Sequence, residues 1–122
     1  MSFIVSLIIM VLLHIINDFN LQGIIAEMKQ ESWWADDAEK YKFDYRVALL
    51  EHSFSWTCFI MLPWIVCRQV SLVWFMLFIL NVGVHCYVDD LKANKFRINL
   101  VGDQIIHFVQ IMVTLIILGS FY

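Results

Sequence analysis

The sequence contains few of the residues that break helices or build flexible linkers. Its 122 residues include one proline and four glycines, and no low-complexity run or Ser/Gly-rich stretch interrupts them. We therefore expect residues 1–122 to form a single domain without a disordered tail. The N-terminus also lacks the basic residues and the small-residue cleavage site of a secretory signal peptide, so we expect the first apolar stretch to be retained.

Two further absences narrow the possible functions. The three cysteines, Cys58, Cys67 and Cys86, are at spacings unlike a CxxC pair, which argues against a disulfide framework or a thiolate zinc knuckle. The net charge of −3, with no basic stripe and no Gly-rich phosphate loop, argues against a nucleic-acid partner.

Apolar residues are abundant instead. They make up 61% of the chain, charged residues make up 16%, and the mean hydropathy is +0.76, which points to lipid as the solvent. Four apolar stretches approach the length of about 20 residues that a membrane-spanning helix needs. They cover residues 3–21, 47–67, 70–88 and 100–122. We predict an all-α polytopic membrane protein, folded as an antiparallel bundle of four transmembrane helices.

The polar residues between these stretches predict the orientation. Seven of the eight Lys and Arg residues lie in the first and third connections, and Arg68 alone lies in the second. The positive-inside rule therefore places the first and third loops in the cytoplasm and both termini outside. The first connection, residues 24–46, mixes tryptophan and tyrosine with charges; it is either an interfacial segment at the headgroup level or a solvated loop.

Each predicted helix carries one histidine, and three of the four have an aspartate four residues away, which places both side chains on one helix face. A charged side chain facing lipid costs at least roughly 2.5–3.5 kcal/mol, so we expect these faces to turn inward. All seven groups lie toward the cytoplasmic loops, where we expect them to converge. The candidate metal ligands are His14, Asp18, His52, His85, Asp89, Asp103 and His107.

Neutral imidazoles with carboxylates suit a divalent transition metal, zinc first, with manganese or iron as alternatives. Seven ligands exceed one tetrahedral shell. Either two ions bind, or one ion binds and some aspartates accept hydrogen bonds from its imidazole ligands. A hydrogen-bonded His/Asp network without metal and a proton or ion relay are the competing interpretations.

Three charged residues are weaker candidates. Glu51 adjoins His52 and is a candidate general base, or else a helix-end charge at the interface. Lys92 follows Asp89 by one helical turn and is a candidate contact for a phosphate or a lipid headgroup, although a lysine that snorkels to the interface is the more common case. The same two interpretations apply to Lys29.

These residues resemble a known family, the domain-of-unknown-function family three-three-zero-seven of small bacterial and phage integral membrane proteins. The matching elements span nearly the whole chain. They are His14-x-x-x-Asp18-Phe19-x-Leu21-Gln22, Lys29, His52, His85-x-x-x-Asp89-x-x-Lys92 and Asp103-Gln104-x-x-His107. The chain also resembles, more distantly, membrane-bound proteins labelled metal-dependent hydrolases. The resemblance implies that these residues form one functional set, in a bacterial inner membrane, and names no substrate.

The leading hypothesis is a metal-dependent hydrolase acting on a lipid or phosphoester at the cytoplasmic headgroup region, where a metal ion generates a nucleophile from water at neutral pH. Membrane lipid is then both solvent and candidate substrate. Two alternatives stay open. One is a non-catalytic protein in which a structural metal holds short helices together, and the other is a proton or metal-ion carrier, for which an oligomer is a possible form. The sequence alone does not decide whether the protein is an enzyme.

Overall fold

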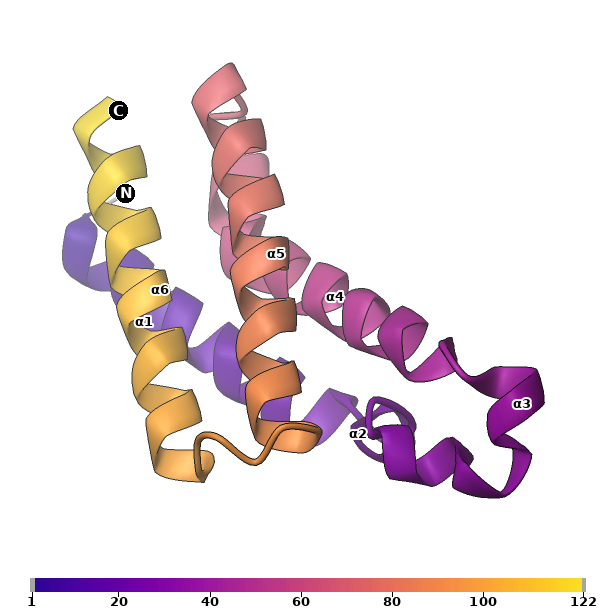
Figure 1. Ribbon diagram of the computed structural model, residues 1–122. Coiled ribbons are helices and arrows are strands. Elements are labelled where there is room, and N and C mark those ends of the chain that lie inside the picture. Colours follow the sequence, from indigo (N-terminus) through magenta and orange to yellow (C-terminus); the bar gives the residue numbers. More distant parts are fainter. Residues whose placement is uncertain (1, 122) are drawn as a thin grey trace.

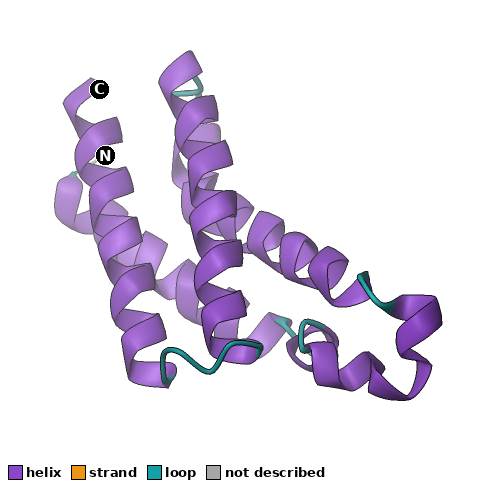
Figure 2. Ribbon diagram, in the orientation of Figure 1, coloured by secondary structure: helices purple, strands orange, loops and turns teal. Residues whose placement is uncertain are grey.

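The computed structural model describes residues 2–121, and these form helices joined by short loops, with no strand among them (Figure 1, Figure 2). Four helical segments are long and apolar enough to cross a membrane. They are α1 (Phe3–Ile15) continued by the π-helical turn η1 (Ile16–Leu21), α4 (Asp44–Val66), α5 (Leu72–Ala93) and α6 (Leu100–Phe121). The prediction of an all-α bundle of four spanning helices is confirmed.

The four spanning segments pack as a closed ring. α1 contacts α4 and α6, and α5 contacts the same two helices on the opposite side. The turn between α4 and α5 lies at the same end as both chain ends (Figure 1). The other end, which we call the loop end, carries the α5–α6 loop, η2 (Glu31–Asp37) and two short helices, α2 (Ile25–Met28) and α3 (Ala38–Tyr41). Side chains from all four spanning segments can therefore meet along one axis.

The distribution of side chains is the reverse of that in a water-soluble bundle. Large apolar residues cover the outside; Ile4, Leu72 and Ile79, for example, are 68%, 76% and 72% exposed. Polar and charged side chains are buried between the helices. Lipid is the solvent that such a surface requires, so the four helices fit an integral membrane protein.

The interior is divided along its length into an apolar and a polar half. Toward the turn between α4 and α5, tryptophan, methionine and aliphatic side chains make a buried core that includes Ile60, Leu77 and Leu115. Toward the loop end, buried histidine, aspartate and lysine take their place. Trp56, fully buried, belongs to the apolar core and also contacts the polar half. The fold thus confines its buried ionisable groups to one end.

Short-range features of the backbone and side chains define the ends of the helices around this polar half. The side chain of Asn99 accepts a hydrogen bond from the backbone N–H of Gly102 and caps the start of α6. Gly23, with φ of +53°, follows η1 in the left-handed conformation that glycine adopts readily. α5 continues to Ala93, five residues beyond the end of the predicted apolar stretch. The ionisable residues Asp89 and Lys92 are therefore held on the last turns of a regular helix.

Candidate metal centre

All seven predicted metal ligands are buried and lie in the polar half of the bundle, so the expected convergence is confirmed. His85, Asp89, Asp103 and His107 are fully inaccessible to solvent. Six of the seven side chains approach one another closely, and we call them the His/Asp cluster. The His/Asp cluster consists of Asp18, His52, His85, Asp89, Asp103 and His107. Each of the four spanning segments contributes at least one of these residues.

Asp89 occupies the middle of the His/Asp cluster. Its Oδ1 lies 3.2 Å from His107 Nε2 and 3.8 Å from His85 Nε2. Its Oδ2 lies 3.5 Å from His52 Nε2. One carboxylate thus faces imidazole nitrogens from α4, α5 and α6, a convergence that brings together residues far apart in the sequence.

Asp18 and Asp103 complete the His/Asp cluster on the α1 and α6 sides. Asp18 Oδ1 lies 3.1 Å from His52 Nε2 and 4.0 Å from His85 Nε2. Asp103 Oδ1 lies 3.2 Å from His107 Nε2. Three overlapping triads result, and within each triad the candidate ligand atoms lie within 4.8 Å of one another. The triads are Asp18–His52–His85, His85–Asp89–His107 and Asp18–Asp103–His107.

Each of the three aspartates divides its two oxygens between different tasks. The Oδ2 of Asp89 accepts a hydrogen bond from Lys29 Nζ, and the Oδ2 of Asp103 accepts one from Lys92 Nζ, both at 2.6 Å. The Oδ2 of Asp18 accepts a hydrogen bond from Gln104 Nε2 at 3.0 Å. The three Oδ1 atoms face imidazole nitrogens, and Asp89 Oδ2 also lies 3.5 Å from His52 Nε2. Partners that hold one oxygen and aim the other are typical of metal sites with an ordered outer shell.

Several buried polar atoms of these residues have no hydrogen-bond partner in the described part of the chain, which bears on whether the residues could hold a metal ion. Among the described residues, neither ring nitrogen of His85 has a hydrogen-bond partner, and Asp103 Oδ1 has none. A buried polar atom left without a partner costs about 1–3 kcal/mol of stability. With metal–ligand bonds of about 2.0–2.1 Å, neighbouring atoms of a tetrahedral shell lie roughly 3.3–3.4 Å apart. The Nε2 of His107 lies 3.2 Å from carboxylate oxygens of Asp89 and Asp103, whereas the Nε2 of His85 lies farther from its nearest carboxylate oxygens, at 3.8 and 4.0 Å. These buried histidine and aspartate groups could hold a metal ion.

His14 differs from the other three histidines because both of its ring nitrogens are engaged. Trp56 Nε1 donates to His14 Nδ1 at 2.7 Å. An indole N–H can only donate, so Nδ1 accepts and the proton is on Nε2, which lies 3.0 Å from Gln104 Oε1. The side chain of His14 is thus an orienting group in this structure. The sequence-based prediction had included it among the ligands.

Gln104 links the two acidic sides of the His/Asp cluster. Because its Oε1 accepts from His14, its amide group donates, and Nε2 lies 3.0 Å from Asp18 Oδ2 and 3.1 Å from Asp103 Oδ2. The hydrogen-bond direction is therefore fixed along the whole path from Trp56 to the two aspartates. Trp56 was absent from the predicted site, and Gln104 entered the prediction only through the motif of the resembled family, without an assigned role. The spacing of Trp56 four residues after His52, on one helix face, is the signal that could have indicated it.

The two candidate lysines are both part of the site. Lys29 follows α2, is 4% exposed, and reaches across the loop end to Asp89. Its backbone oxygen accepts a hydrogen bond from Asn94 Nδ2 at 3.0 Å, which fastens the first connection to the end of α5. Lys92, predicted as a catalytic contact, pairs with Asp103. Three aspartates and two lysines leave one negative charge, which either a bound cation or one protonated histidine would balance.

Glu51, the other predicted catalytic residue, lies apart from these groups. Its side chain is exposed although that of its neighbour His52 is buried, because consecutive residues of a helix point about 100° apart. Within residues 2–121, Glu51 makes no hydrogen bond or ion pair with the His/Asp cluster. We therefore assign it no role there.

The π-helical turn η1 brings Asp18 into the site. Its backbone hydrogen bonds span five residues, one more than in an α-helix, and such turns are often found at functional sites. Asn17 and Asp18 are its two buried residues. Asn17 Nδ2 donates to Ser55 Oγ at 2.9 Å, and Gln22 Nε2 donates to the backbone oxygen of Asp18. These contacts with α4 and within the turn hold the Asp18 carboxylate toward His52.

A cavity of about 350 Å³ opens at the loop end beside the His/Asp cluster. Its wall includes Asp18 and Gln104 from the site together with both lysines. Asp18 is thus the member of the His/Asp cluster that borders this cavity. The chain matches no protein-family model, no curated protein and no solved structure.

Proposed function

We propose that this protein is an integral membrane metalloprotein that hydrolyses an ester at the loop end of its bundle. One observation supports this most strongly. His85 Nε2 is buried without a hydrogen-bond partner, between carboxylate oxygens of Asp89 and Asp18 that lie 3.8 and 4.0 Å away. A nitrogen in such a position suits a metal ligand better than a structural hydrogen bond.

The ligand set favours zinc, with manganese and iron as alternatives, because imidazole nitrogen and carboxylate oxygen suit all three. A bound ion would supply a water-derived nucleophile at neutral pH and polarise the ester. The oxygen of water forms a bond to phosphorus or to the acyl carbon. The bond to the leaving alcohol oxygen breaks, and this oxygen receives a proton that the water loses. The products are an acid and an alcohol, so the reaction needs no further reactant.

The residues of the chain have separate tasks in this proposal. His52, His85, His107 and the three Oδ1 atoms would hold one or two ions. Gln104, Lys29 and Lys92 hold the opposite oxygens of the same aspartates. Trp56 and His14 in turn fix the direction of the Gln104 amide. The fixed partners reduce the reorganisation that binding and reaction require.

The first test is the metal content of detergent-purified protein, measured by elemental mass spectrometry. Wild type is compared with a His85→Ala, His107→Ala double variant and with Asn81→Leu. Asn81 is buried one helical turn from His85 on the same face of α5, so its variant controls for loss of a buried polar side chain. We expect one or two equivalents in wild type and in Asn81→Leu, and none in the double variant. Wild type that takes up no metal after reconstitution would overturn the proposal.

Hydrolysis is tested separately with metal-loaded protein and chromogenic esters. A nitrophenyl phosphate, a bis-nitrophenyl phosphate and a nitrophenyl acyl ester represent the three candidate ester classes. Turnover of at least one of them is expected, and it should disappear in the His85→Ala, His107→Ala double variant. Equal turnover in the metal-free double variant would refute the assignment of hydrolysis to this site.

A structural metal clamp is the second candidate function. It is favoured by the contribution of all four spanning segments to the His/Asp cluster, since helices in lipid lack a hydrophobic drive to associate. In that case chelation lowers the thermal unfolding midpoint, but none of the esters is hydrolysed. The two candidates share the metal measurement and differ in the turnover measurement.

A further inference from the structure

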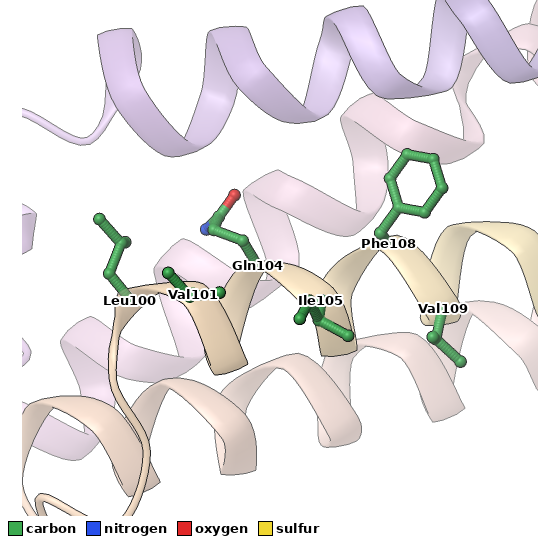
Figure 3. Close-up of a pocket in the computed structure, with 6 residues that line it drawn as sticks. All are labelled: Leu100, Val101, Gln104, Ile105, Phe108 and Val109. Atoms are coloured by element: carbon green, nitrogen blue, oxygen red, sulfur yellow. The ribbon is translucent and has the colours of Figure 1, made fainter.

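Two cavities meet at the edge of the candidate metal centre. The polar cavity at the loop end, about 350 Å³, and a shallow apolar groove of about 510 Å³ on α6 share Leu100 and Gln104 as lining residues. The rest of the groove is formed by Val101, Ile105, Phe108 and Val109 (Figure 3). Leu100, Gln104 and Phe108 point toward α1 in this view, as the spacing of four residues requires. The two cavities therefore adjoin at Leu100 and Gln104, near the start of α6.

The polar cavity presents hydrogen-bond donors that suit an anion. Lys29 and Lys92 both line it, together with the carboxylate of Asp18, whose negative charge a bound cation would offset. An ammonium group carries three donors, and within residues 2–121 each of these two makes one hydrogen bond, to Asp89 or Asp103. Both lysines thus keep donors for a further acceptor. Two ammonium groups on one wall match the several oxygens of a phosphate group.

The groove has the length and surface of a hydrocarbon site. Leu100 to Val109 extends about 14 Å along α6 at 1.5 Å per residue, which is roughly half of the 30 Å hydrocarbon core of a bilayer. It therefore runs from the headgroup level to near the membrane centre, the depth of one leaflet. Apart from Gln104, its lining residues are apolar, and all five of those are exposed on the lipid side.

We propose that the ligand of this protein is a phosphate-bearing membrane lipid of the leaflet at the loop end. Its phosphate occupies the polar cavity between Lys29 and Lys92, and its acyl chain lies in the groove on α6. Entry is lateral, between α1 and α6, with Gln104 at the junction of head and chain. The inference deepens the proposed hydrolysis, because it names the substrate class for the same site.

The test measures binding rather than turnover. Native mass spectrometry of protein released from micelles of an uncharged detergent is carried out with three probes. They are a long-chain lysophosphatidic acid, glycerol phosphate without the chain, and monoacylglycerol without the phosphate. We expect the first probe to bind at least about tenfold more tightly than either of the others. Equal binding of glycerol phosphate would indicate a soluble phosphate ligand, and equal binding of monoacylglycerol would indicate ordinary lipid contact; either result overturns the proposal.

Variants of the groove and of the cavity test separately where the acyl chain and the phosphate of the lipid bind. Ile105→Trp fills the groove and should weaken lysophosphatidic acid binding about tenfold, whereas Val113→Trp, eight residues further on the exposed surface of α6 and outside the groove, should not. Lys92→Gln removes one charge-assisted donor and should weaken binding of the same probe about tenfold. An effect of Val113→Trp equal to that of Ile105→Trp would overturn the placement of the chain.

The same measurements on chelator-treated protein separate this proposal from the metal-dependent function. The lysines and the groove are present without a metal ion. Selective binding of lysophosphatidic acid by metal-free protein, together with no turnover of any ester by metal-loaded protein, would support the lipid site while refuting hydrolysis. Turnover of soluble esters without selective lipid binding would support hydrolysis and refute the lipid site.

Discussion

The ammonium group of Lys29 lies 2.6 Å from Asp89 Oδ2, across 60 residues of sequence, and both side chains are buried. This ion pair joins the first connection of the chain to the middle of the His/Asp cluster. It also leaves Asp89 Oδ1 facing His85 and His107. The pair therefore stabilises the loop end and sets the direction of a candidate ligand atom.

Replacement of Lys29 by methionine should strongly destabilise the metal-free protein. The variant leaves the Asp89 carboxylate buried without its cation, a change that costs about 3–5 kcal/mol. Lys95→Met is the control, because Lys95 Nζ is 3.7 Å from Asp90 Oδ2 and its side chain is 55% exposed; the expected loss there is below about 1 kcal/mol. Unfolding of both variants in detergent, after chelation, provides the comparison. If both variants lost a similar, small amount of stability, the result would contradict a stabilising role of the buried Lys29–Asp89 ion pair.

Gln104→Glu should weaken metal binding. The new carboxylate cannot donate to Asp18 and Asp103, and it adds negative charge beside both of them. Changes of this kind in residues that orient metal ligands typically reduce affinity about 10–100-fold. Titration of metal-free protein with zinc in the presence of a competing chelator measures the affinity. Gln69→Glu, at the opposite end of the bundle, should leave it unchanged, and an unchanged affinity in Gln104→Glu would contradict the orienting role.

Cys67 provides a test of the membrane orientation. It lies exposed next to the α4–α5 turn, whereas Cys58 and Cys86 are partly buried within spanning helices. If the loop end faces the cytoplasm, a membrane-impermeant thiol reagent added to intact cells should label wild type but not Cys67→Ser. A cysteine introduced as Glu39→Cys, in the Cys67→Ser background, should react only after permeabilisation. The opposite pattern would invert the topology.

Asn81 and Thr114 should contribute to stability without affecting metal binding. Asn81 Nδ2 donates to Thr114 Oγ1 at 2.9 Å between α5 and α6. Interhelical hydrogen bonds in membranes have coupling free energies of about 0.6 kcal/mol, and about 1.7 kcal/mol at most. A double-mutant cycle with Asn81→Leu and Thr114→Val should give a value in this range. Loss of metal from either single variant would contradict the separation of this pair from the site.

Much of the fold follows from patterns that act locally. The four apolar stretches predicted the spanning helices, and the spacing of His85 and Asp89, or of Asp103 and His107, predicted which helix faces turn inward. These predictions hold because lipid penalises an exposed charge strongly. The end of α5 was placed too early, since the apolar run stops at Val88, but the helix continues through buried polar residues to Ala93. Hydropathy underestimates a helix whose last turns face a polar interior.

The remaining features depend on contacts between distant residues. The burial of Lys29 requires the first connection to fold back over the loop end, and nothing near Lys29 in the sequence indicates its partner. The π-helical turn that contains Asp18 is also set by packing against α4, through Asn17 and Ser55. The different environment of His14 depends on Trp56 and Gln104. Three conclusions from the sequence stay predictions. They are the membership of the resembled family, the location in a bacterial membrane and the orientation of the helices in that membrane.

Trp56 gives the protein an internal optical reporter. Its indole ring stacks on the imidazole of His85 with centroids 4.2 Å apart, and its N–H donates to His14. An indole in direct contact with a candidate ligand should lose its fluorescence when a paramagnetic ion such as manganese or iron binds, and should keep most of it with zinc. The other four tryptophans supply a background that a Trp56→Phe variant would define. Whether the bound ion is paramagnetic can therefore be followed in solution, by the light that this side chain emits above the background of the others.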